Sequence, residues 1–586
     1  MSKEGAPTGQ ILLIRAMNAT RPTYFPSYMG LRIVGSQMPA DNTGYLERMI
    51  VRRLRSGDSW RYRPFDLYKG TTGKHGEQPE HVYRKCIAPS PSTAIAESLV
   101  LALLATDPIF KVPDRVFSYR WPKTPYSGGN YEFFAQGYIQ RNVEIGAALS
   151  EGKVAVVTDI KGFYPSVSVD QAEDALRGRL TQSNSQLRNN AESIMGFYRG
   201  LLEAGGQGIP IGPASGHVLG HLILENVDKE LTDQFGTSYF RYVDDIIVVA
   251  NEADRRSVEK TVDACLRRYG FEPNADKSVA LPAQAWEHNL VRSDTNSTDT
   301  FRAFTSDLTV YLAFHPDRAE DIKKAFAASG LSIPVGKLLA ISRYSRFRYF
   351  LRRRKAPEGL GHALSLWLSD NSALLKRALE LKASYERALA LLLDEPHEKE
   401  PSLRRWQVQR IRRVVNIMFY LREFGEWREA TSSMEEFPEL VEQHALADAL
   451  CTGRANPVLP FYGRGPSAFA ELWGEYGNGV VALDWTKDGL TSAELESVIT
   501  LQLHGTLTQV EPNMDGEHPH ARLMRMASYD RPQTRSSPDL SFEDELESLR
   551  LSVSNDELSA LGRTRYSLTE STALDALTLM SSDYRS

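Results

Sequence analysis

Two adjacent aspartates between apolar runs constrain this chain more than any other feature. Asp244 and Asp245 follow Tyr239–Tyr242 and precede Ile246–Ala250, and both runs have the length and composition of buried strands. Runs joined by so short a turn predict a β-hairpin, although this turn lacks the usual glycine. Two carboxylates about 4 Å apart repel each other by roughly 4 kcal/mol at an effective dielectric of about 20. A bound cation would offset that repulsion.

The alternative is a solvated turn, where most Asp-Asp pairs of an average chain lie. The surrounding pattern argues against it, because Val154–Thr158 reads as a buried strand that would carry Asp159 to a sheet edge. Helical periodicity predicts three helices, namely Asp170–Leu180, Ser215–Phe235 with Ser215 as a cap, and Arg255–Tyr269. The order strand, helix, helix, hairpin, helix predicts an antiparallel sheet with helices on one face, an α+β arrangement.

The character of the chain changes near residue 300, where strand patterns fade. Segments rich in Leu, Ala, Arg and Glu predict a mainly α-helical region with helices over Pro316–Ala328, Ala373–Asp394, Ser402–Phe424 and Glu435–Leu450. Gly477–Leu483 is compatible with a strand. Polar residues and prolines between 512 and 538 predict a linker, and the acidic run Phe542–Glu547 is expected to be the solvated face of a helix.

Composition sets few further limits. The 586 residues are 42% hydrophobic and 24% charged, which is ordinary for a soluble globular protein. The three cysteines lie far apart, so neither a disulfide framework nor a zinc finger is expected, and a reducing cytoplasm fits best. Neither a signal-peptide pattern nor an apolar stretch of membrane-spanning length is recognisable. The net charge of −5 does not exclude nucleic acid, because binding depends on local patches.

Asp159, Asp244 and Asp245 are a suitable ligand set for two divalent ions. Nucleotidyl transfer uses two such ions about 3.5–4 Å apart, and Mg²⁺ needs few carboxylates because it keeps several waters. A third segment, Gly205–Ser215, is rich in glycine and proline and opens a helix. Small residues let the backbone approach a ligand closely, and a helix N-terminus favours anions. A plain Gly/Pro turn is the alternative reading of that segment.

Four segments resemble, in order, motifs A to D of reverse transcriptases. Asp159–Ser166 resembles motif A, Gln207–Ser215 motif B, Tyr242–Asp245 the YxDD box of motif C, and Gly270–Lys277 motif D. The Ile-Pro-Ile-Gly-Pro form of the second segment departs from the Pro-Gln-Gly-Ser-Pro form of group II intron and many retron enzymes. It is more similar to the abortive-infection and defence-associated (unknown-group) reverse transcriptases of prokaryotes.

The resemblance implies a right-hand polymerase core of fingers and palm, followed by a mainly α-helical C-terminal domain. We therefore expect an N-terminal and fingers region at 1–150, the palm at 151–300, the helical domain at 301–510, and a polar linker with an acidic tail at 511–586. The implied activity is RNA-directed or template-independent DNA synthesis from dNTPs, in bacterial antiviral defence. A mobile-element or retron-like reverse transcriptase and an inactive nucleic-acid-binding scaffold are the alternatives.

The resemblance also assigns roles to the residues that match the motifs. Asp159 and Asp244 are expected to bind Mg²⁺, or Mn²⁺ in its place, with the backbone carbonyl of Ile160 as a further ligand. Asp245 would lie beside them as the third carboxylate of the metal site. Lys277 would protonate the departing pyrophosphate, and an exposed lysine without a role is the alternative.

Three further residues are expected to contact the incoming nucleotide. Tyr164 matches the steric-gate position, where its ring would exclude a ribose 2′-hydroxyl and favour dNTPs; a core aromatic is the alternative. Gln207 would position the incoming base or the template. Arg115 is our preferred ligand for the triphosphate, ahead of the other cations considered in the first 150 residues, Arg84, Lys85 and Arg120.

A basic and aromatic segment, 343–355, contains seven cations and no acid. Cations with interleaved rings can follow a nucleic-acid backbone and stack on bases, and the alternative is a helix that buries its rings and exposes its arginines. The arginines expected to bind nucleic acid are Arg343, Arg346, Arg348, Arg352, Arg353 and Arg354. The expected partners are an RNA template, a DNA product and dNTPs. A non-coding RNA, a partner defence protein and homo-oligomers remain open, and no membrane partner is expected.

Overall fold

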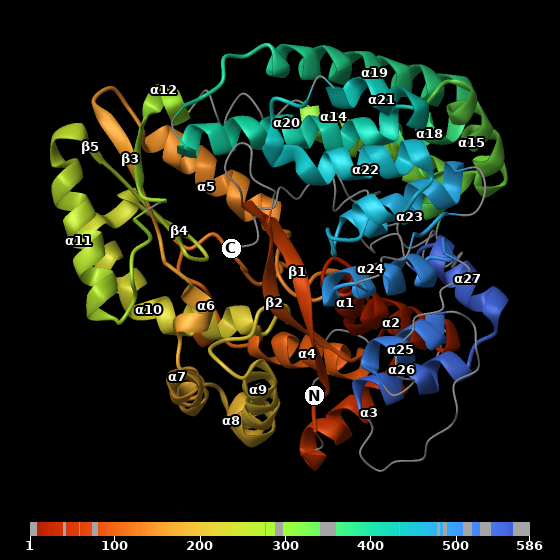
Figure 1. Ribbon diagram of the computed structural model, residues 1–586. Coiled ribbons are helices and arrows are strands. Elements are labelled where there is room, and N and C mark those ends of the chain that lie inside the picture. Colours follow the sequence, from red (N-terminus) through yellow and green to blue (C-terminus); the bar gives the residue numbers. More distant parts are fainter. Residues whose placement is uncertain are drawn as a thin grey trace.

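The computed structural model describes most of the chain between Gly9 and Tyr566. The described residues are 9–38, 43–57, 59–72, 80–275, 277–286, 297–339, 359–399, 401–432, 434–477, 481–484, 489–507, 518–527 and 541–566. They form many helices and two antiparallel sheets (Figure 1), so the expected mixture of helix and sheet is confirmed.

A four-stranded antiparallel sheet lies at one side of the molecule, with the strand order β4-β5-β3-β6. Its strands are β3 (Lys153–Asp159), β4 (Tyr239–Tyr242), β5 (Asp245–Asn251) and β6 (Val279–Pro282). β3 and β5 are short continuous apolar runs and are largely buried. The register pairs Asp159 with Asp245, so the ends of the two central strands bring these carboxylates side by side.

Three helices follow the strands in the expected places: α7 (Val169–Gln182), α10 (Gly216–Phe235) and α11 (Arg255–Arg268). α10 and α11 pack on the sheet, and α7 packs on α10. These helices and the strands β3, β4 and β5 agree with the sequence expectation to within one or two residues. The cap of α10 is a correction, because the Ser215 hydroxyl caps no backbone N–H of its own helix and donates to Glu97 instead.

The described N-terminal part of the chain contains a long β-hairpin and five α-helices. β1 (Tyr62–Thr72) and β2 (Glu80–Pro89) form the hairpin, and the helices are α1 (Gly9–Thr20), α2 (Phe25–Gln37), α3 (Thr43–Ser56), α4 (Pro91–Leu104) and α5 (Phe134–Ala148). α4 is apolar and buried on nearly every side, as expected for a helix inside a core. It packs against α1, α3 and β2.

After Pro282 the described residues form helices and no further strand of more than one residue. The helices are α12 (Ala283–Trp286), α14 (Ser297–Phe314), α15 (Ala319–Ala328), α16 (Val335–Leu338), α18 (Gly359–Leu368), α19 (Asn371–Leu393), α20 (Pro401–Leu421), α21 (Trp427–Ser432), α22 (Val441–Thr452), α23 (Gly465–Tyr476), α24 (Ser492–Leu503), α25 (Pro519–Ala527), α26 (Phe542–Leu551) and α27 (Asn555–Arg563). The strand considered at Gly477–Leu483 is reduced, in its described part, to a single bridge between Ala482 and Arg454. Among the described helices, none combines the length and apolarity that crossing a membrane demands.

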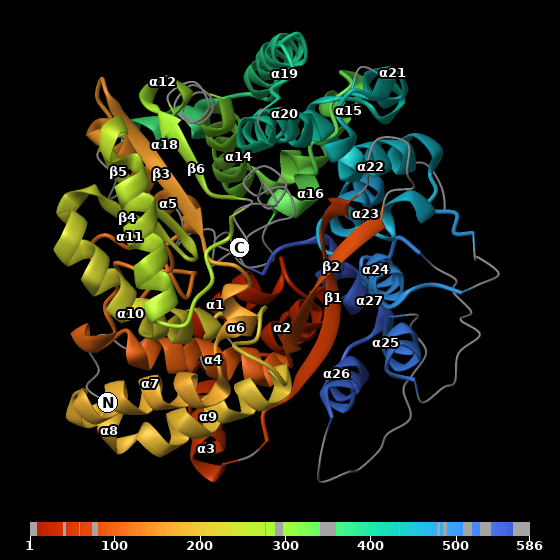
Figure 2. The same ribbon diagram turned by 60° about the vertical axis from the view of Figure 1, so that its left-hand side comes forward.

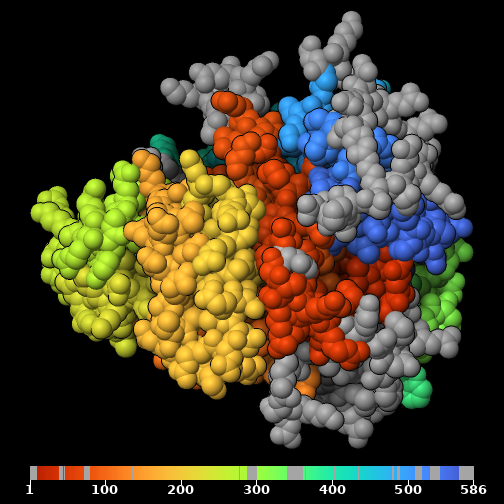
Figure 3. All heavy atoms as spheres, turned by 90° about the horizontal axis from the view of Figure 1, so that it is seen from below, coloured from red at the N-terminus to blue at the C-terminus, as the bar shows by residue number. Residues whose placement is uncertain are grey.

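The last helices return to the N-terminal region. α26 and α27 pack against α2, and α24 packs against both α2 and β1. Figures 1 and 2 show the blue C-terminal helices beside the red N-terminal ones, and Figure 3 shows the blue and red surfaces meeting on one face. Segments at opposite ends of the sequence therefore share one packed unit.

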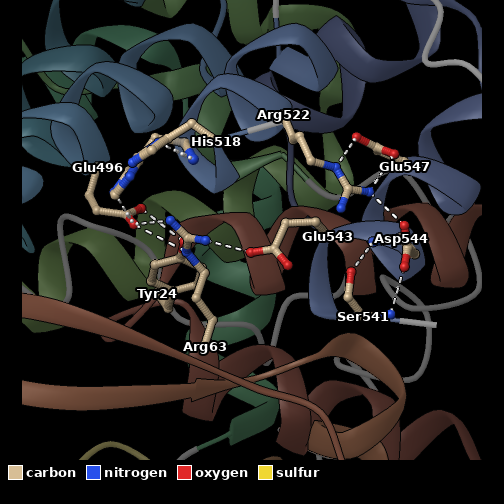
Figure 4. Close-up of polar contacts among 10 residues, drawn as sticks. Tyr24, Arg63, Glu496, His518, Arg522, Ser541, Glu543, Asp544 and Glu547 are labelled. Carbon is tan, nitrogen blue, oxygen red and sulfur yellow. Dashed lines mark hydrogen bonds and ion pairs between the residues drawn. The ribbon is translucent and has the colours of Figure 1, made fainter. Parts of the chain in front are cut away.

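An ion-pair network joins these segments (Figure 4). Arg63 of β1 pairs with the buried Glu496 of α24 at 3.0 Å and with Glu543 of α26. Arg522 of α25 pairs with Asp544 at 2.6 Å. The acidic run is therefore not the solvated helix face that the sequence suggested, because buried arginines need carboxylate partners and this run supplies them.

Candidate active site

Asp159 is the last residue of β3 and is almost fully buried. The Asn274 side-chain amide donates to its Oδ2 at 2.9 Å, and the Asn274 N–H donates to its backbone carbonyl at 2.8 Å. The ammonium group of Lys277 lies 3.0 Å from the same Oδ2. The loop after α11 thus holds Asp159 and brings Lys277 to it.

Asp244 is the second residue of the two-residue turn between β4 and β5. Val243, the first turn residue, has a φ of +55°, in the left-handed region that such turns require and that glycine normally supplies. That conformation costs a β-branched residue about 1–3 kcal/mol. The Val243 N–H donates to the Ser118 hydroxyl at 2.9 Å, and its carbonyl accepts a bond from Arg241 at 2.7 Å. Two side chains therefore hold the strained turn.

Arg241 is buried, and Asp228 of α10 balances its charge. Its Nε and Nη2 each donate to one carboxylate oxygen of Asp228 at 2.6 Å, and the Tyr239 hydroxyl donates to the same carboxylate at 2.6 Å. Burial alone would lower the pKa of Arg241, but Asp228 raises it above its ordinary value. An arginine within a buried strand is a signal for Arg241 in the sequence, but nothing local marks Asp228 as its partner.

The three aspartates form one cluster. Asp159, Asp244 and Asp245 each offer a carboxylate oxygen, and these oxygens lie within 4.8 Å of one another. Oδ1 of Asp159 is buried and accepts no hydrogen bond from the described residues. The Ile160 N–H donates to the Asp244 carbonyl at 3.3 Å, which joins the two segments. Hard carboxylate oxygens with an unsatisfied buried atom fit divalent cations such as Mg²⁺ or Mn²⁺.

Asp245 has a cationic neighbour that the sequence analysis did not single out. Nη1 of Arg141, a buried residue of α5, lies 3.9 Å from Oδ2 of Asp245, whose side chain is 37% exposed. Burial raises the pKa of Asp245, Arg141 lowers it and Asp159 raises it, and the net shift is upward. The Arg141 guanidinium also lies over the rings of Tyr138 and Tyr242, at 4.7 and 5.3 Å from their centroids.

Tyr164 lies beside this cluster, on the short helix α6 (Phe163–Ser166). Its hydroxyl shares a hydrogen bond of 2.7 Å with Nδ1 of His217, the second residue of α10. Burial lowers the pKa of His217 to about 3, so this imidazole is neutral at physiological pH. Burial raises the pKa of Tyr164 well above its usual value, so its hydroxyl keeps its proton. The ring is therefore held in one orientation.

The glycine-rich loop packs tightly below Tyr164. Gly208 has a φ of +68°, and a Cβ there would lie 2.5 Å from the Tyr164 carbonyl oxygen. Gly212 has a φ of +124°, and a Cβ there would lie 2.3 Å from the Ile87 carbonyl oxygen on β2. Both positions therefore require glycine. Gln207, between α9 (Ala191–Gly205) and these contacts, has an exposed side chain.

Glu97 of α4 anchors the end of this loop. Its carboxylate accepts hydrogen bonds from the Ser215 N–H at 2.8 Å and the Ser215 hydroxyl at 2.6 Å. Glu97 is fully buried, and burial raises its pKa to about 7 although the bonds from Ser215 oppose the shift. The Tyr131 hydroxyl donates to the neighbouring Ala214 carbonyl at 2.8 Å.

The structure does not bring Arg115 to the carboxylates. Its guanidinium donates to Glu144 at 3.0 Å and to the backbone carbonyls of Tyr239 and Thr237, so it holds the outer edge of β4 to α5. These local acceptors bind the N–H groups of the Arg115 guanidinium, so the structure lends no support to Arg115 as the preferred triphosphate ligand.

Lys69 of the β1–β2 hairpin lies within electrostatic range of the cluster, and Arg84 lines a pocket together with Lys69. Arg84, Lys277, Asp159 and Asp244 all act electrostatically on Lys69. Partial burial and the two cations lower the pKa of Lys69, and the two carboxylates oppose that shift. Arg84 was a candidate from the sequence, whereas Lys69 was not.

Two other candidate cations have local partners. Lys85 pairs with Asp66 at 2.7 Å, and Arg120 donates to the carbonyls of Val116 and Asp114 at 2.8 Å. The arginines of the basic segment, Arg343, Arg346, Arg348, Arg352, Arg353 and Arg354, lie outside the described residues.

Comparison with known proteins adds a domain assignment. Residues 106–302 match the family described as reverse transcriptase (RNA-dependent DNA polymerase), so this part of the chain is a reverse-transcriptase domain. The chain is 24% identical over 168 residues to the Retron Ec73 reverse transcriptase of Escherichia coli, a match that covers 27% of this chain and 51% of that relative. The chain thus matches about half the length of this relative.

A solved structure of apo telomerase from Candida tropicalis is similar at 11% sequence identity, over 70% of this chain and 73% of that one. Its TM-score of 0.27 is too low to support an inference about the fold.

Proposed function

We propose that this protein is a DNA polymerase that adds dNTPs by two-metal nucleotidyl transfer, directed by RNA or acting without a template. The observation that carries the proposal is the cluster of Asp159, Asp244 and Asp245 within a reverse-transcriptase domain. Within this proposal, residues 1–150 supply the fingers, with the β1–β2 hairpin at their centre, and 151–300 supply the palm. The helices of 301–510 form the C-terminal domain, and 511–586 form a polar linker and a terminal segment whose helices α26 and α27 pack on α2.

In the proposed reaction, the primer 3′-oxygen bonds to the α-phosphorus of a dNTP. The bond from that phosphorus to its bridging oxygen breaks, and pyrophosphate leaves. Divalent ions bound at this site would lower the pKa of the 3′-hydroxyl and neutralise charge on the triphosphate. Asp159 and Asp244 would hold these ions, with Asp245 as the third carboxylate and the Ile160 carbonyl as a further ligand.

Lys277 would take part in the departure of pyrophosphate. Its ammonium group is 3.0 Å from Oδ2 of Asp159, which supports this role because a group bound at that carboxylate would lie close to the lysine. It would donate a proton to the leaving oxygen and stabilise the charge that develops there. Lys69 and Arg84 on the hairpin would hold the remaining phosphates.

Tyr164 would select the sugar. The bond to His217 holds the ring in one orientation, and the 2′-hydroxyl of a ribonucleotide bound at the aspartate cluster would meet this ring. Gln207 would contact the base or the template from the exposed loop above α10. The arginines of the basic segment would bind the backbone of the nucleic acid.

The experiment is incorporation of labelled dNTPs by the purified chain in Mg²⁺ or Mn²⁺, with an RNA template, a DNA template or no template. We expect synthesis that stops when a chelator is added. Sequencing the product distinguishes copying of RNA from template-independent addition. A pure, folded protein that adds no dNTP in any arm would refute the polymerase and favour an inactive nucleic-acid-binding scaffold.

For the biological role, we propose antiviral defence in bacteria, with a retron-like or mobile-element enzyme as the second candidate. The form of the glycine-rich loop supports the first, and the similarity to a retron reverse transcriptase supports the second. Bacteriophage plating on cells with the parent chain or with Asp244→Asn tests the role. Protection that depends on Asp244 is expected, and equal plating on both strains would exclude a defence role that uses synthesis.

A further inference from the structure

A pocket lies where the β1–β2 hairpin meets the C-terminal helices. Lys69 and Arg84 line it from the hairpin, and Glu442 of α22 and Arg464 line it from the helical part. Tyr68 and Tyr462 contribute the rings of its wall. Three cations against one carboxylate make this pocket electropositive, which suits an anion.

The hairpin that carries Lys69 and Arg84 is bonded to the glycine-rich loop next to Tyr164. The Ile87 N–H of β2 donates to the Ile211 carbonyl at 2.9 Å, and the Ile209 N–H donates to the Tyr164 carbonyl at 2.9 Å. Partial burial, Arg84 and Lys277 lower the pKa of Lys69, while Asp159 and Asp244 oppose the shift. One lysine thus lies in the field of both the pocket and the metal-binding carboxylates. An anion in the pocket would therefore be next to whatever those carboxylates bind, which favours the far end of a bound triphosphate over a distant stretch of nucleic-acid backbone.

Arg464 is held in place by contacts with the hairpin. The Tyr68 N–H donates to the Tyr462 carbonyl at 3.2 Å, so the segment before Arg464 is bonded directly to β1. Gly463 has a φ of +128°, a backbone conformation that favours glycine, and a Cβ there would lie 2.8 Å from the Leu67 side chain. Arg464 then precedes the first turn of α23. A residue that follows Asp244 by 220 positions in the sequence is thereby fixed beside the hairpin.

We propose that Arg464 completes the site for the β- and γ-phosphates of the incoming dNTP, together with Lys69 and Arg84. The inference rests on the proposed polymerase function and adds that the nucleotide site is incomplete without the C-terminal helices. A guanidinium fork suits a terminal phosphate because it donates two parallel hydrogen bonds. The Glu442 carboxylate limits the excess positive charge when the pocket is empty.

The test is steady-state incorporation as a function of dNTP concentration, with Arg464→Gln and Arg464→Ala. Loss of one charge-assisted hydrogen bond to phosphate predicts a KM for dNTP raised about 10-fold or more, with a smaller change in kcat. Arg454→Ala is the matched control, because Arg454 is an exposed arginine nearby that pairs with Asp484. Arg464→Gln keeps part of the side chain and is used alone if Arg464→Ala does not fold. Circular dichroism checks the folding of both variants.

A second arm does not need synthesis. Inorganic tripolyphosphate is titrated calorimetrically into the full chain, and RNA affinity is measured in parallel. Weaker tripolyphosphate binding by Arg464→Gln, with RNA affinity unchanged, supports the inference even if the parent protein makes no DNA. Absence of DNA synthesis by the parent protein would instead refute the proposed function. Normal synthesis with a parental KM would overturn the inference alone. Weakened RNA binding with a parental KM would also overturn it and assign Arg464 to the nucleic-acid backbone.

Discussion

At the scale of single residues, the placement of Asp244 depends on its strained neighbour. Val243 keeps a φ of +55° because Ser118 and Arg241 bind its N–H and carbonyl, and Asp228 in turn holds Arg241. A turn freed of these bonds would relax and move the carboxylate that follows. Arg241 is therefore a positioning residue, which acts on the proposed metal site through the turn.

Replacing Arg241 tests this role. Lysine cannot contact both oxygens of Asp228 and the Val243 carbonyl at once, so Arg241→Lys should raise the Mg²⁺ concentration needed for half-maximal synthesis. Arg241→Met leaves Asp228 buried and unpaired and should lower the free energy of unfolding by about 3–5 kcal/mol. Arg268→Lys, in an exposed pair with Glu230, is the control and should change neither quantity. If Arg241→Lys needs the same Mg²⁺ concentration for half-maximal synthesis as the parent, the β4–β5 turn keeps its conformation without Arg241.

Tyr164 makes a second prediction at this scale. Tyr164→Ala removes the ring and should raise rNTP use relative to dNTP use by about 10-fold or more, whereas Tyr164→Phe keeps the ring and should retain most of the discrimination. The ratio of kcat/KM for dCTP and CTP measures it. An unchanged ratio in the Ala variant would make Tyr164 a core aromatic, with the gate elsewhere.

At the scale of elements, the sequence predicts best what is local. β3, the β4–β5 hairpin, α10 and α11 follow from apolar runs and helical periodicity, which depend on neighbouring residues. The aspartate cluster follows as well, because two strand ends and one turn define it.

The missed residues depend on contacts between distant segments. Arg241 with Asp228 and Glu97 with Ser215 join a strand or helix to another helix, and no local pattern marks such a pair. Arg115 was favoured on residue type alone, and the acceptors that engage it became visible only with the fold.

Glu97 links two elements, α4 and the loop that opens α10, and gives a pH prediction. Its pKa is about 7 in the folded chain and near 4.5 unfolded, so the unfolded chain loses this proton first as pH rises. The free energy of unfolding should then fall between about pH 4.5 and 7, by on the order of 3 kcal/mol from this group. Glu97→Gln should flatten that part of the pH profile. If chemical denaturation gives the same pH dependence of the free energy of unfolding for the parent and for Glu97→Gln, the raised pKa does not belong to Glu97.

At the scale of the whole molecule, the two ends of the described chain stabilise each other. Glu545 of α26 accepts bonds from the Ser92 N–H at 2.7 Å and the Ser90 hydroxyl at 2.8 Å, and it pairs with Arg61 at 2.9 Å. It thereby caps α4 from a position about 450 residues away along the chain. The C-terminal helices are thus part of the core that supports the glycine-rich loop.

Glu545→Ala should therefore destabilise the fold by about 3 kcal/mol or more, because it removes a helix cap and leaves Arg61 without its carboxylate. The free energy of unfolding measures the effect. Asp448→Ala, at an exposed position of α22, is the control and should stay within about 0.5 kcal/mol of the parent. If Glu545→Ala and Asp448→Ala have the same free energy of unfolding, α26 contacts the surface without stabilising α4.

The central claim is that Asp159 and Asp244 hold the ions that drive DNA synthesis, and the rate of dNTP incorporation in Asp159→Asn and Asp244→Asn tests it most directly. Loss of a metal-binding carboxylate should lower the rate by about 1,000-fold or more. Asp244→Asn should unfold at or above the parental temperature because it relieves repulsion within the cluster, whereas Asp159→Asn also loses the ion pair with Lys277, so circular dichroism checks that both variants are folded. Asp233→Asn, at an exposed position of α10, should keep the parental rate. Parental rates in folded Asp159→Asn or Asp244→Asn would contradict the account.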